Sequence, residues 1–227
     1  MSTHPLDQPA RSALTGPHAH FAEHRGGVLR YSPDVSFFVG MPAAATARDW
    51  ADAAALVGPG GYVQLAGLTT TPPPGWELAF EGIGVQMVDD GVDAAPDAGA
   101  VLLTADDVPE MLALVERTQP GPFRRRTIEL GTYLGIRDDD GALLAMAGER
   151  LHPPGWTEVS AVCTDPAARG RGLATRLVRA LVHGIRERGE ASFLQCAADN
   201  TTAIGLYGSL GFRLRREVTF TAARVPG

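Results

Sequence analysis

A glycine-containing turn between a predicted strand and a predicted helix constrains the fold of this chain more than any other feature. The turn reads Arg-Gly-Arg-Gly-Leu-Ala-Thr over residues 169–175, and it follows the apolar run 159–163 and the breaker Asp165-Pro166. After it, apolar residues recur at the spacing of one α-helical face, at Leu173, Leu177, Val178, Leu181, Val182 and Ile185. The sequence therefore predicts a strand–turn–helix unit.

The same turn has the properties of an anion-binding site. A helix N-terminus leaves backbone N–H groups unpaired and carries a partial positive charge. Gly170 and Gly172 have no side chain that would keep an anion away, and Arg169 and Arg171 add full positive charges. We therefore expect a phosphate or pyrophosphate at this turn. Taken alone, the glycine pair is equally consistent with a tight structural turn.

Two common phosphate-binding motifs do not fit. A P-loop requires Lys-Ser or Lys-Thr after its last glycine, where this chain has Leu173-Ala174. The dinucleotide-binding fingerprint has three glycines near the start of its domain, whereas this turn has two and lies late in the chain.

A second pattern follows the turn and narrows the choice of phosphate-binding family. The apolar strand 193–196 is followed by an N-cap at Asp199-Asn200 and a short helix that ends at Gly211 before Phe212. The order of elements is a strand, R-G-x-G-L-A, a helix, a strand and then N-x-x-A-x-x-L-Y-x-x-x-G-F. Over roughly residues 98–224 this order resembles the GNAT superfamily of acyl-CoA N-acyltransferases. The phosphate loop of that family often begins with Gln or Arg three residues before the first glycine, and here that position is Ala167.

The resemblance implies an α/β fold with a mixed, mostly antiparallel central sheet, a splayed parallel strand pair and flanking helices. It implies acetyl-CoA as co-substrate and a cofactor-binding set at Val162, Cys163, Thr164, Arg169, Gly170, Arg171, Gly172, Leu173, Ala174, Thr175, Asn200, Ala203 and Tyr207. In this set the pyrophosphate lies on residues 169–175, and Asn200 and Tyr207 line the pantetheine channel. A backbone N–H near Val162 or Cys163 is the expected oxyanion donor.

Two catalytic residues are predicted. Tyr207 corresponds to a tyrosine that points at the cofactor sulfur in the family, as a proton donor or only a hydrogen-bond partner; the alternative is a core tyrosine. Glu158 shares a strand face with Ser160, and a buried carboxylate is costly unless it is paired or used. Similar enzymes often have a glutamate there that acts through a water. Glu158 is thus the predicted base, the alternative is a structural ion pair, and Glu149 is the second candidate.

Other chemically notable side chains have simpler interpretations. A covalent acyl-cysteine at Cys163 would need a neighbouring base, and the sequence shows no paired histidine. His18, His20 and His24 have metal-like spacing but no clear fourth ligand, so a solvated or acceptor-facing cluster is favoured and no metal is expected. The arginines at 124–126 are interpreted as a solvated helix face; the less favoured alternative is that they bind a cofactor phosphate or an acidic acceptor.

The chain divides into two predicted units. Residues 98–227 contain the GNAT-like pattern, with a strand at 100–103, a helix from 108, a second helix around 123–130, strands at 133–137, 142–150 and 156–164, and a last strand pair at 212–214 and 217–222. Residues 1–97 contain apolar segments typical of strands at 28–31, 35–39, 62–65, 77–80 and 83–88, and a helix that begins after Thr46. They are predicted to form an α/β lobe that contributes to the acceptor cleft, either a degenerate GNAT-like half or an unrelated cap.

Composition limits the partners and the compartment that the sequence predicts. The 227 residues carry a formal charge of −6, which argues against broad nucleic-acid binding. No apolar run approaches the roughly 18 residues of a membrane span, and no secretion signal is evident. The two cysteines form no spaced framework and are expected to be buried thiols in a reducing, cytoplasmic compartment.

The predicted function is therefore transfer of an acetyl group from acetyl-CoA to an amine of a small molecule or peptide, by direct attack in a ternary complex. The alternative is a non-catalytic acyl-CoA-binding sensor or regulatory module. A third hypothesis is nucleic-acid or partner binding through the arginine clusters.

Overall fold

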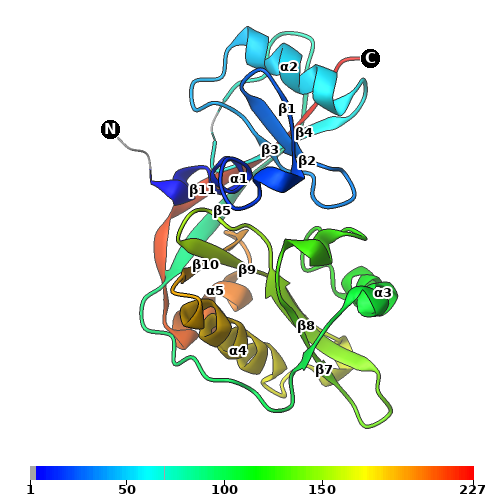
Figure 1. The fold of residues 1–227 in the computed structure, drawn as a ribbon, viewed down its shortest axis with the longest axis vertical. Coiled ribbons are helices and arrows are strands. Elements are labelled where there is room, and N and C mark those ends of the chain that lie inside the picture. Colours follow the sequence, from blue (N-terminus) through cyan, green and yellow to red (C-terminus); the bar gives the residue numbers. More distant parts are fainter. Residues whose placement is uncertain (1–3, 69) are drawn as a thin grey trace.

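Two long antiparallel strands, β5 (Glu77–Asp89) and β11 (Phe212–Arg224), connect the two parts of the molecule. In the computed structural model, which describes residues 4–68 and 70–227, these strands run from the lower body to a smaller N-terminal lobe (Figure 1). Below, they join the main sheet and its helices. Above, they reach the small sheet and helix of the lobe.

The main sheet has eight strands in the order β4-β11-β5-β10-β9-β8-β7-β6. The remaining members are β4 (Tyr62–Ala66), β6 (Val101–Leu102), β7 (Tyr133–Arg137), β8 (Leu143–Glu149), β9 (Trp156–Thr164) and β10 (Ala191–Ala197). Its neighbouring strands are antiparallel except β9 and β10, which are parallel. These two pair only over three residues, ending at Glu158 opposite Phe193, and then diverge. The predicted mixed sheet with a splayed parallel pair is confirmed.

Helices pack against this sheet through the predicted apolar faces. Helix α4 (Leu173–Glu187) buries seven side chains, Leu173, Leu177, Val178, Ala180, Leu181, Val182 and Ile185, and contacts β7, β8, β9 and β10. Burial of each large one contributes roughly 1.5–3 kcal/mol. Helix α3 (Val108–Thr118) packs on β8 and β9, and α5 (Thr201–Leu210) packs on β11.

The N-terminal lobe, defined here as residues 4–57, contains α1 (Pro9–Leu14), an antiparallel sheet of β1 (Ala22–Arg25), β2 (Val28–Tyr31) and β3 (Val39–Gly40), and α2 (Ala47–Val57). Helix α2 begins at the predicted N-cap, Thr46, in a capping box with Asp49. No parallel strand pair occurs among the described residues of the lobe.

The main sheet crosses the predicted boundary at residue 97, because β4 and β5 precede it and pair with β10 and β11. Hydrophobic clusters cross it as well: Leu6 and Tyr31 share a cluster with Leu151 and Phe193. The two-unit division stays a prediction, and the two parts share one sheet and a continuous core.

Two predicted elements are shorter in the structure. The strand 35–39 is reduced to the two residues of β3. The second helix at 123–130 is a single 3-10 turn, Thr127–Leu130, whose Thr127 hydroxyl accepts from the Arg124 N–H and donates to the Val35 carbonyl, both at 2.7 Å. The side chain of this threonine thus competes with a regular helix.

The predicted breaks in β5 and β11 are absent. Strand β11 is continuous through a bulge at Arg215, whose guanidinium donates to Gln86 Oε1 at 2.8 Å and Asp7 Oδ1 at 2.7 Å. Strand β5 continues through Gly82 and Gly84 because aromatic rings, described below, fill the space beside these glycines. At these two positions glycine makes room for a neighbouring ring within a continuous strand.

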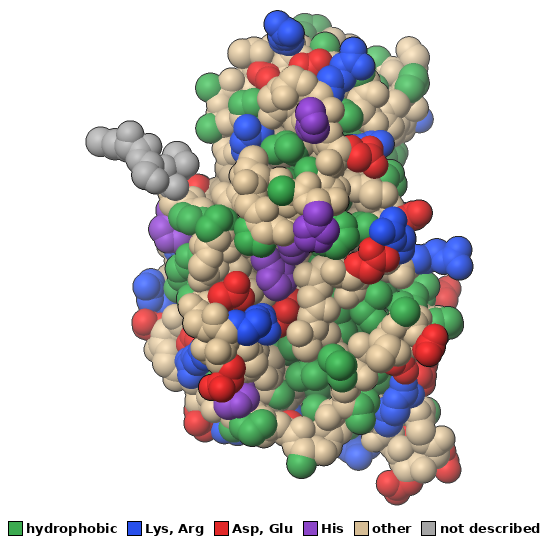
Figure 2. Space-filling view, in the orientation of Figure 1, with side chains coloured by type: hydrophobic (Ala, Val, Ile, Leu, Met, Phe, Trp, Pro, Cys, Tyr) green, Lys and Arg blue, Asp and Glu red, His purple; other side chains and the backbone are tan. Residues whose placement is uncertain are grey.

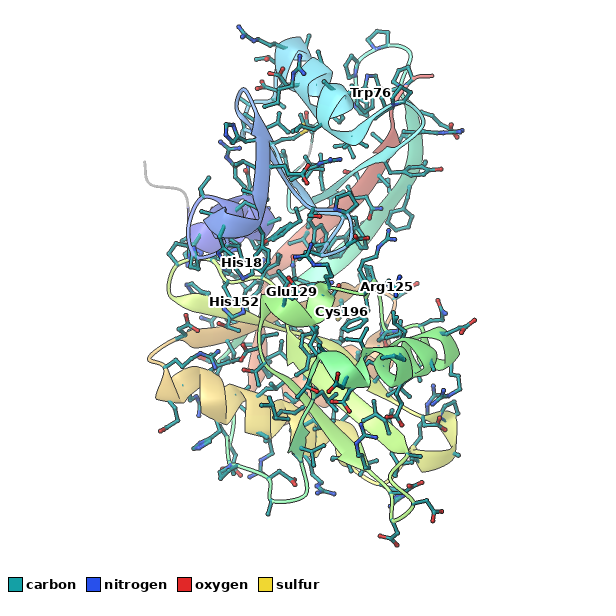
Figure 3. All side chains as sticks on the ribbon, turned by 45° about the vertical axis from the view of Figure 1, so that its right-hand side comes forward. His18, Trp76, Arg125, Glu129, His152 and Cys196 are labelled. Atoms are coloured by element: carbon teal, nitrogen blue, oxygen red, sulfur yellow. The ribbon has the colours of Figure 1, made fainter. Side chains whose placement is uncertain are left out.

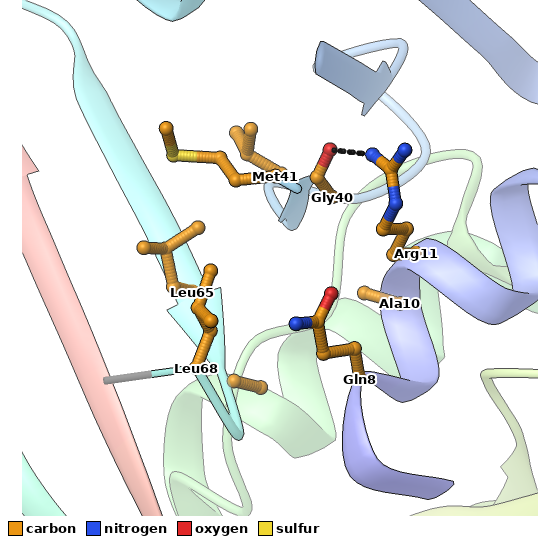
Figure 4. Close-up of a pocket in the computed structure, with 9 residues that line it drawn as sticks. Gln8, Ala10, Arg11, Gly40, Met41, Leu65 and Leu68 are labelled. Carbon is orange, nitrogen blue, oxygen red and sulfur yellow. Dashed lines mark hydrogen bonds between the residues drawn. The ribbon is translucent and has the colours of Figure 1, made fainter. Parts of the chain in front are cut away.

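A small cavity lies where α1 meets β3 and β4, and Figure 4 shows Arg11 donating from Nη1 to the Gly40 carbonyl at 3.1 Å beside it. Its volume of about 10 Å³ leaves room for no more than one water. None of the helices that the structure describes has the length and apolar character needed to cross a bilayer.

Candidate active site

The divergence of β9 and β10 opens a cavity of about 700 Å³. Beyond Glu158, residues 159–164 line this cavity, and the edge of β9 that faces β10 has no strand partner. Peptide groups on that edge are therefore available to hydrogen-bond an extended ligand.

A bulge in β9 turns its backbone into the cavity. Cys163 pairs with Met146 and Ser160 with Gly148, so two residues, Ala161 and Val162, lie opposite the single Ala147. Ala161 has a φ of 51°, a left-handed conformation that costs a non-glycine residue about 1–2 kcal/mol. Strain of this kind is concentrated at functional sites. No feature of Val-Ser-Ala-Val-Cys indicated the bulge.

Eight of the predicted cofactor-binding residues line the cavity, and we call them the turn-side half: Val162, Cys163, Thr164, Arg169, Ala174, Asn200, Ala203 and Tyr207. The other five, Gly170, Arg171, Gly172, Leu173 and Thr175, lie outside the lining. Leu173 is buried in the core on α4.

The glycine turn has the geometry expected for anion binding. Gly170 and Gly172 have φ values of 77° and 72°, and Gly172 is the N-cap of α4 with no side-chain cap. A Cβ at either glycine would meet nothing within 4 Å, so the space before the helix is open. Arg169 and Arg171 are exposed and form no salt bridge within the described ranges. The unpaired N–H groups of the first helical turn are thus accessible to an anion.

Tyr207 lies on α5 with its side chain 9% exposed and lines the cavity. Burial raises the pKa of its phenol, so the hydroxyl stays protonated and can donate a hydrogen bond over the neutral range. Asn200 also lines the cavity, and its Oδ1 accepts from the Ala203 N–H at 3.1 Å, which caps α5 as predicted from the sequence.

The two cysteines are free thiols on this half of the cavity. Burial raises the pKa of both Cys163 and Cys196, which disfavours the thiolate that a nucleophile needs. The side chain that hydrogen-bonds Cys163 is Thr118, which is not a base. The environment therefore gives no support to a covalent acyl-cysteine.

Glu158 lies beneath the cavity with 0% exposure and is not part of its lining. Its oxygens accept from Arg150 Nε and Nη2, both at 2.8 Å, and Oε1 also accepts from Gln195 Nε2 at 3.0 Å. A proton on this carboxylate would compete with these hydrogen bonds. The arrangement is that of the structural ion pair, the alternative to the predicted base.

Glu149 is also paired and also lies outside the lining. It accepts from Arg188 Nη2 at 2.7 Å and from the Thr132 N–H at 3.1 Å, and its Oε2 lies 3.7 Å from His152 Nε2. Neither candidate base therefore faces the cavity directly.

Side chains far apart in the sequence form the other end of the cavity, which we call the lobe-side half: Phe37, Phe38, Gln64, Phe80, Arg150 and Phe220. Phe38 bridges to Gln64, which lies opposite Ala222, which in turn lies opposite Phe80, so these residues form one row across the lobe and the sheet. The N-terminal residues were expected to contribute to the acceptor cleft in general terms, but none of these side chains was predicted. Only the packing of distant segments brings these side chains together, so no local sequence pattern could identify them.

The predicted histidine cluster is divided. His18 is buried, with Nδ1 2.9 Å from the Tyr31 hydroxyl and its ring 4.9 Å from that of His152, at the level where the N-terminal lobe meets the lower body (Figure 3). His20 and His24 are exposed. The described residues contain no group of three side chains placed to hold a metal ion.

The arginines at 124–126 lie at the surface, where Arg126 pairs with Glu129 at 2.7 Å and Arg124 lies over the Phe37 ring. On the face shown in Figure 2, basic and acidic side chains are interspersed. This face therefore presents no continuous basic surface of the kind that nucleic acid requires.

Comparison with known proteins gives matches over both the whole chain and its C-terminal part. Residues 133–221 match the family model described as FR47-like protein. A solved structure of a GNAT-family protein from Novosphingobium aromaticivorans is 41% identical with a TM-score of 0.90, covering 99% of this chain and 100% of that chain. A GCN5-related N-acetyltransferase from Kribbella flavida has the same fold at 18% identity and a TM-score of 0.60, covering 96% of each chain.

Curated relatives match over shorter stretches. A mycothiol acetyltransferase from Nocardia farcinica is 50% identical over 154 residues, which are 60% of this chain and 50% of the relative. The N-alpha-acetyltransferase RimI from Mycobacterium tuberculosis is 40% identical over 84 residues, 36% of this chain and 51% of the relative. The chain spans about half or less of the length of the curated relatives that it matches.

Proposed function

The chain belongs to the GNAT family of acyltransferases, and on that premise we propose that it transfers an acetyl group from acetyl-CoA to a primary amine. The amine is carried by a small molecule or a peptide. Transfer proceeds by direct attack in a ternary complex, in a reducing, cytoplasmic compartment where both cysteines remain thiols.

One observation carries this proposal: a single cavity is lined by eight of the thirteen predicted cofactor residues and by a second, chemically different set of side chains. On the turn-side half, the glycine turn and the uncapped N-terminus of α4 suit a pyrophosphate, and the free edge of β9 suits an amide-containing chain. The lobe-side half leaves space for an acceptor beside them. The names of the relatives, which include a mycothiol acetyltransferase and an N-alpha-acetyltransferase, support acetyl transfer to nitrogen.

Acetyl-CoA would supply the activated acyl group as a thioester. The residues 169–175 and the edge of β9 bind and orient it, which places the acyl carbon beside the acceptor. A backbone N–H near Val162 or Cys163, exposed by the bulge at Ala161, stabilises the charge that develops on the carbonyl oxygen. Tyr207, held protonated by burial, donates to the departing sulfur.

Glu158 takes a positioning role in this scheme. Its three hydrogen bonds hold Arg150 and Gln195 at the bottom of the cavity. The described lining contains no Asp, Glu or His, so the amine loses its proton to water in the cavity rather than to a side chain there.

The test is release of free CoA thiol from acetyl-CoA over a panel of amines. Tyr207→Phe should lower kcat by about 100-fold, a typical effect of removing a general acid, with the CoA dissociation constant unchanged. Tyr62→Phe, at an exposed tyrosine on β4 that does not line the cavity, is the matched control and should leave kcat unchanged. CoA binding without thiol release from any amine would favour the sensor alternative, and absence of CoA binding would refute the proposal.

A further inference from the structure

The lobe-side half of the cavity has an unusual charge pattern for a site that takes an amine. Within residues 4–68 and 70–227 the cavity is lined by two charged side chains, Arg150 and Arg169, and both are cationic. Arg169 lies at the glycine turn, so Arg150 is the charged group on the acceptor side. Arg124, over the Phe37 ring, adds a third cation nearby. A second positive charge on the acceptor would find no carboxylate partner in this lining.

Arg150 and Gln195 offer a complementary pair of hydrogen-bonding groups. Arg150 donates to Glu158 through Nε and Nη2, and its Nη1 has no hydrogen-bond partner among the described residues. Gln195 donates to Glu158 through Nε2, and its Oε1 is buried without a partner. One group can therefore donate to an oxygen while its neighbour accepts from an N–H. An amine next to a carbonyl presents both of these functions.

Aromatic rings line the same half of the cavity as these polar groups. The guanidinium of Arg150 lies over the Phe38 ring at 5.2 Å, and Phe80 and Phe220 lie on neighbouring strands of the sheet. The rings of Phe80 and Phe220 occupy the space that a Cβ at Gly82 and Gly84 would need. A site of this composition suits an aromatic or aliphatic side chain.

The absence of a base among the described lining residues restricts the amine further. Without such a group, the reactive fraction depends on the pKa of the amine itself. At pH 7 an α-amine with a pKa near 8 is neutral in about one molecule in ten, but a lysine-like amine near 10.4 in about one in 2,500. An α-amine is therefore the chemically suited acceptor.

We propose that the acceptor is the α-amine of an amino-acid amide or peptide-like unit with an aromatic or aliphatic side chain, and not a polycation. The inference rests on the proposed acetyl transfer and specifies its acceptor. The carbonyl oxygen of this unit accepts from Arg150 Nη1, its amine donates to Gln195 Oε1, and its side chain packs among Phe38, Phe80 and Phe220.

The experiment measures acceptor binding by calorimetry, without turnover, on protein saturated with free CoA. The probes are L-phenylalaninamide, 2-phenylethylamine, which has the ring but no carbonyl, and spermidine. Phenylalaninamide should bind at least tenfold more tightly than spermidine and at least threefold more tightly than phenylethylamine. Equal or tighter binding of spermidine or phenylethylamine would overturn the inference.

A pair of charge variants locates the site. Phe80→Glu places a carboxylate in the lining and should strengthen spermidine binding while weakening phenylalaninamide by about tenfold. Ile83→Glu, on the same strand and 62% exposed against 56% for Phe80, lies outside the lining and should change neither. No difference between the two variants would also overturn the inference.

The CoA titration on the same preparations tests the proposed function separately. If CoA does not bind, acetyl transfer is refuted, and the order of the three amines on the free protein still decides the acceptor inference.

Discussion

The two halves of the cavity differ in the groups that form them: backbone groups in the turn-side half and side chains in the lobe-side half. The turn-side half, whose eight members come from residues 162–207, adjoins the glycine turn and the uncapped N-terminus of α4, and it relies mainly on backbone groups. The lobe-side half uses side chains that come from Phe37 at one extreme and Phe220 at the other, anchored by the buried ion pair of Arg150 and Glu158. A backbone site depends on local conformation, whereas a side-chain site depends on how distant segments pack.

This difference predicts that substitutions will separate the two halves. Changes on the lobe-side should alter stability and acceptor binding and leave CoA affinity unchanged. Changes at the glycine turn should weaken CoA binding and leave acceptor binding unchanged. The predictions at the ion pair and at the glycines test that separation, a prediction at His18 tests the contact between the lobe and the lower body, and all are ordered from the largest expected effect.

The largest effect is expected at the buried ion pair. Arg150→Met leaves the Glu158 carboxylate, which is 0% exposed, without its charged partner. Breaking such a pair typically costs about 3–5 kcal/mol. We therefore expect a loss of that size in the free energy of unfolding, measured with urea at pH 7.

The double variant Arg150→Met/Glu158→Met is the matched control. Because it removes both charges, it should recover most of the lost stability while acceptor binding stays weak. A double variant as unstable as the single one would show that the pair is not what anchors the lobe-side half.

The next effect is a loss of folding stability at low pH, caused by His18 at the contact between the N-terminal lobe and the lower body. Burial, with the nearby His152 and His20, lowers the pKa of His18 to about 3. In the unfolded chain this imidazole titrates near 6.5, so between pH 6.5 and 3 the unfolded state binds a proton that the folded state does not. Stability is thus unaffected above pH 6.5 and falls as pH decreases, by roughly 3 kcal/mol at pH 4.5 from this group.

The measurement is the difference in the free energy of unfolding between pH 7 and pH 4.5. His18→Gln should reduce that difference by roughly 3 kcal/mol, independently of the change in stability that the substitution causes at pH 7. His24→Gln, at an exposed position on β1, is the control and should retain the full acid loss. Equal acid sensitivity of the two variants would contradict the assignment.

A smaller effect is expected where an aromatic ring lies beside a glycine. A Cβ at Gly84 would meet the Phe220 ring and, at 2.8 Å, the Cys196 carbonyl oxygen. Overpacking of this kind costs about 1–3 kcal/mol and moves Phe220, so Gly84→Ala should destabilise the fold and raise the acceptor KM several-fold. The CoA dissociation constant should not change. Gly184→Ala, on α4 with open space around it, is the control and should be neutral or slightly stabilising.

The same contrast explains what the sequence could predict. The strand, the turn with Gly170 and Gly172, and the helix with its apolar face at Leu177 and Leu181 are each encoded within a few residues, so their type and order were recognisable. The cap at Asn200 is equally local, and the structure places it as expected.

The rest depended on contacts between distant residues. Strand β5 was predicted as two segments, 77–80 and 83–88, because the rings that pack beside Gly82 and Gly84 cannot be seen in a linear pattern. The left-handed Ala161 is held by the pairing of β9 with β8, and no composition rule indicates such strain. Glu158 was predicted as the base, with a structural ion pair as the alternative. Its partner Arg150 lies on another segment, so only the geometry shows the bidentate contact.

The smallest effect is the sharpest test of the turn-side half. Gly172 and Gly189 precede and follow α4, have φ values of 72° and 75°, and have open space where a Cβ would lie. Alanine at either position should cost about 1 kcal/mol of stability through left-handed strain. Only Gly172 adjoins the helix N-terminus, so Gly172→Ala should also weaken CoA binding by about tenfold, or 1.4 kcal/mol, while Gly189→Ala leaves it unchanged. If both variants bind CoA equally well, the turn is structural and the backbone at 169–175 does not hold the cofactor.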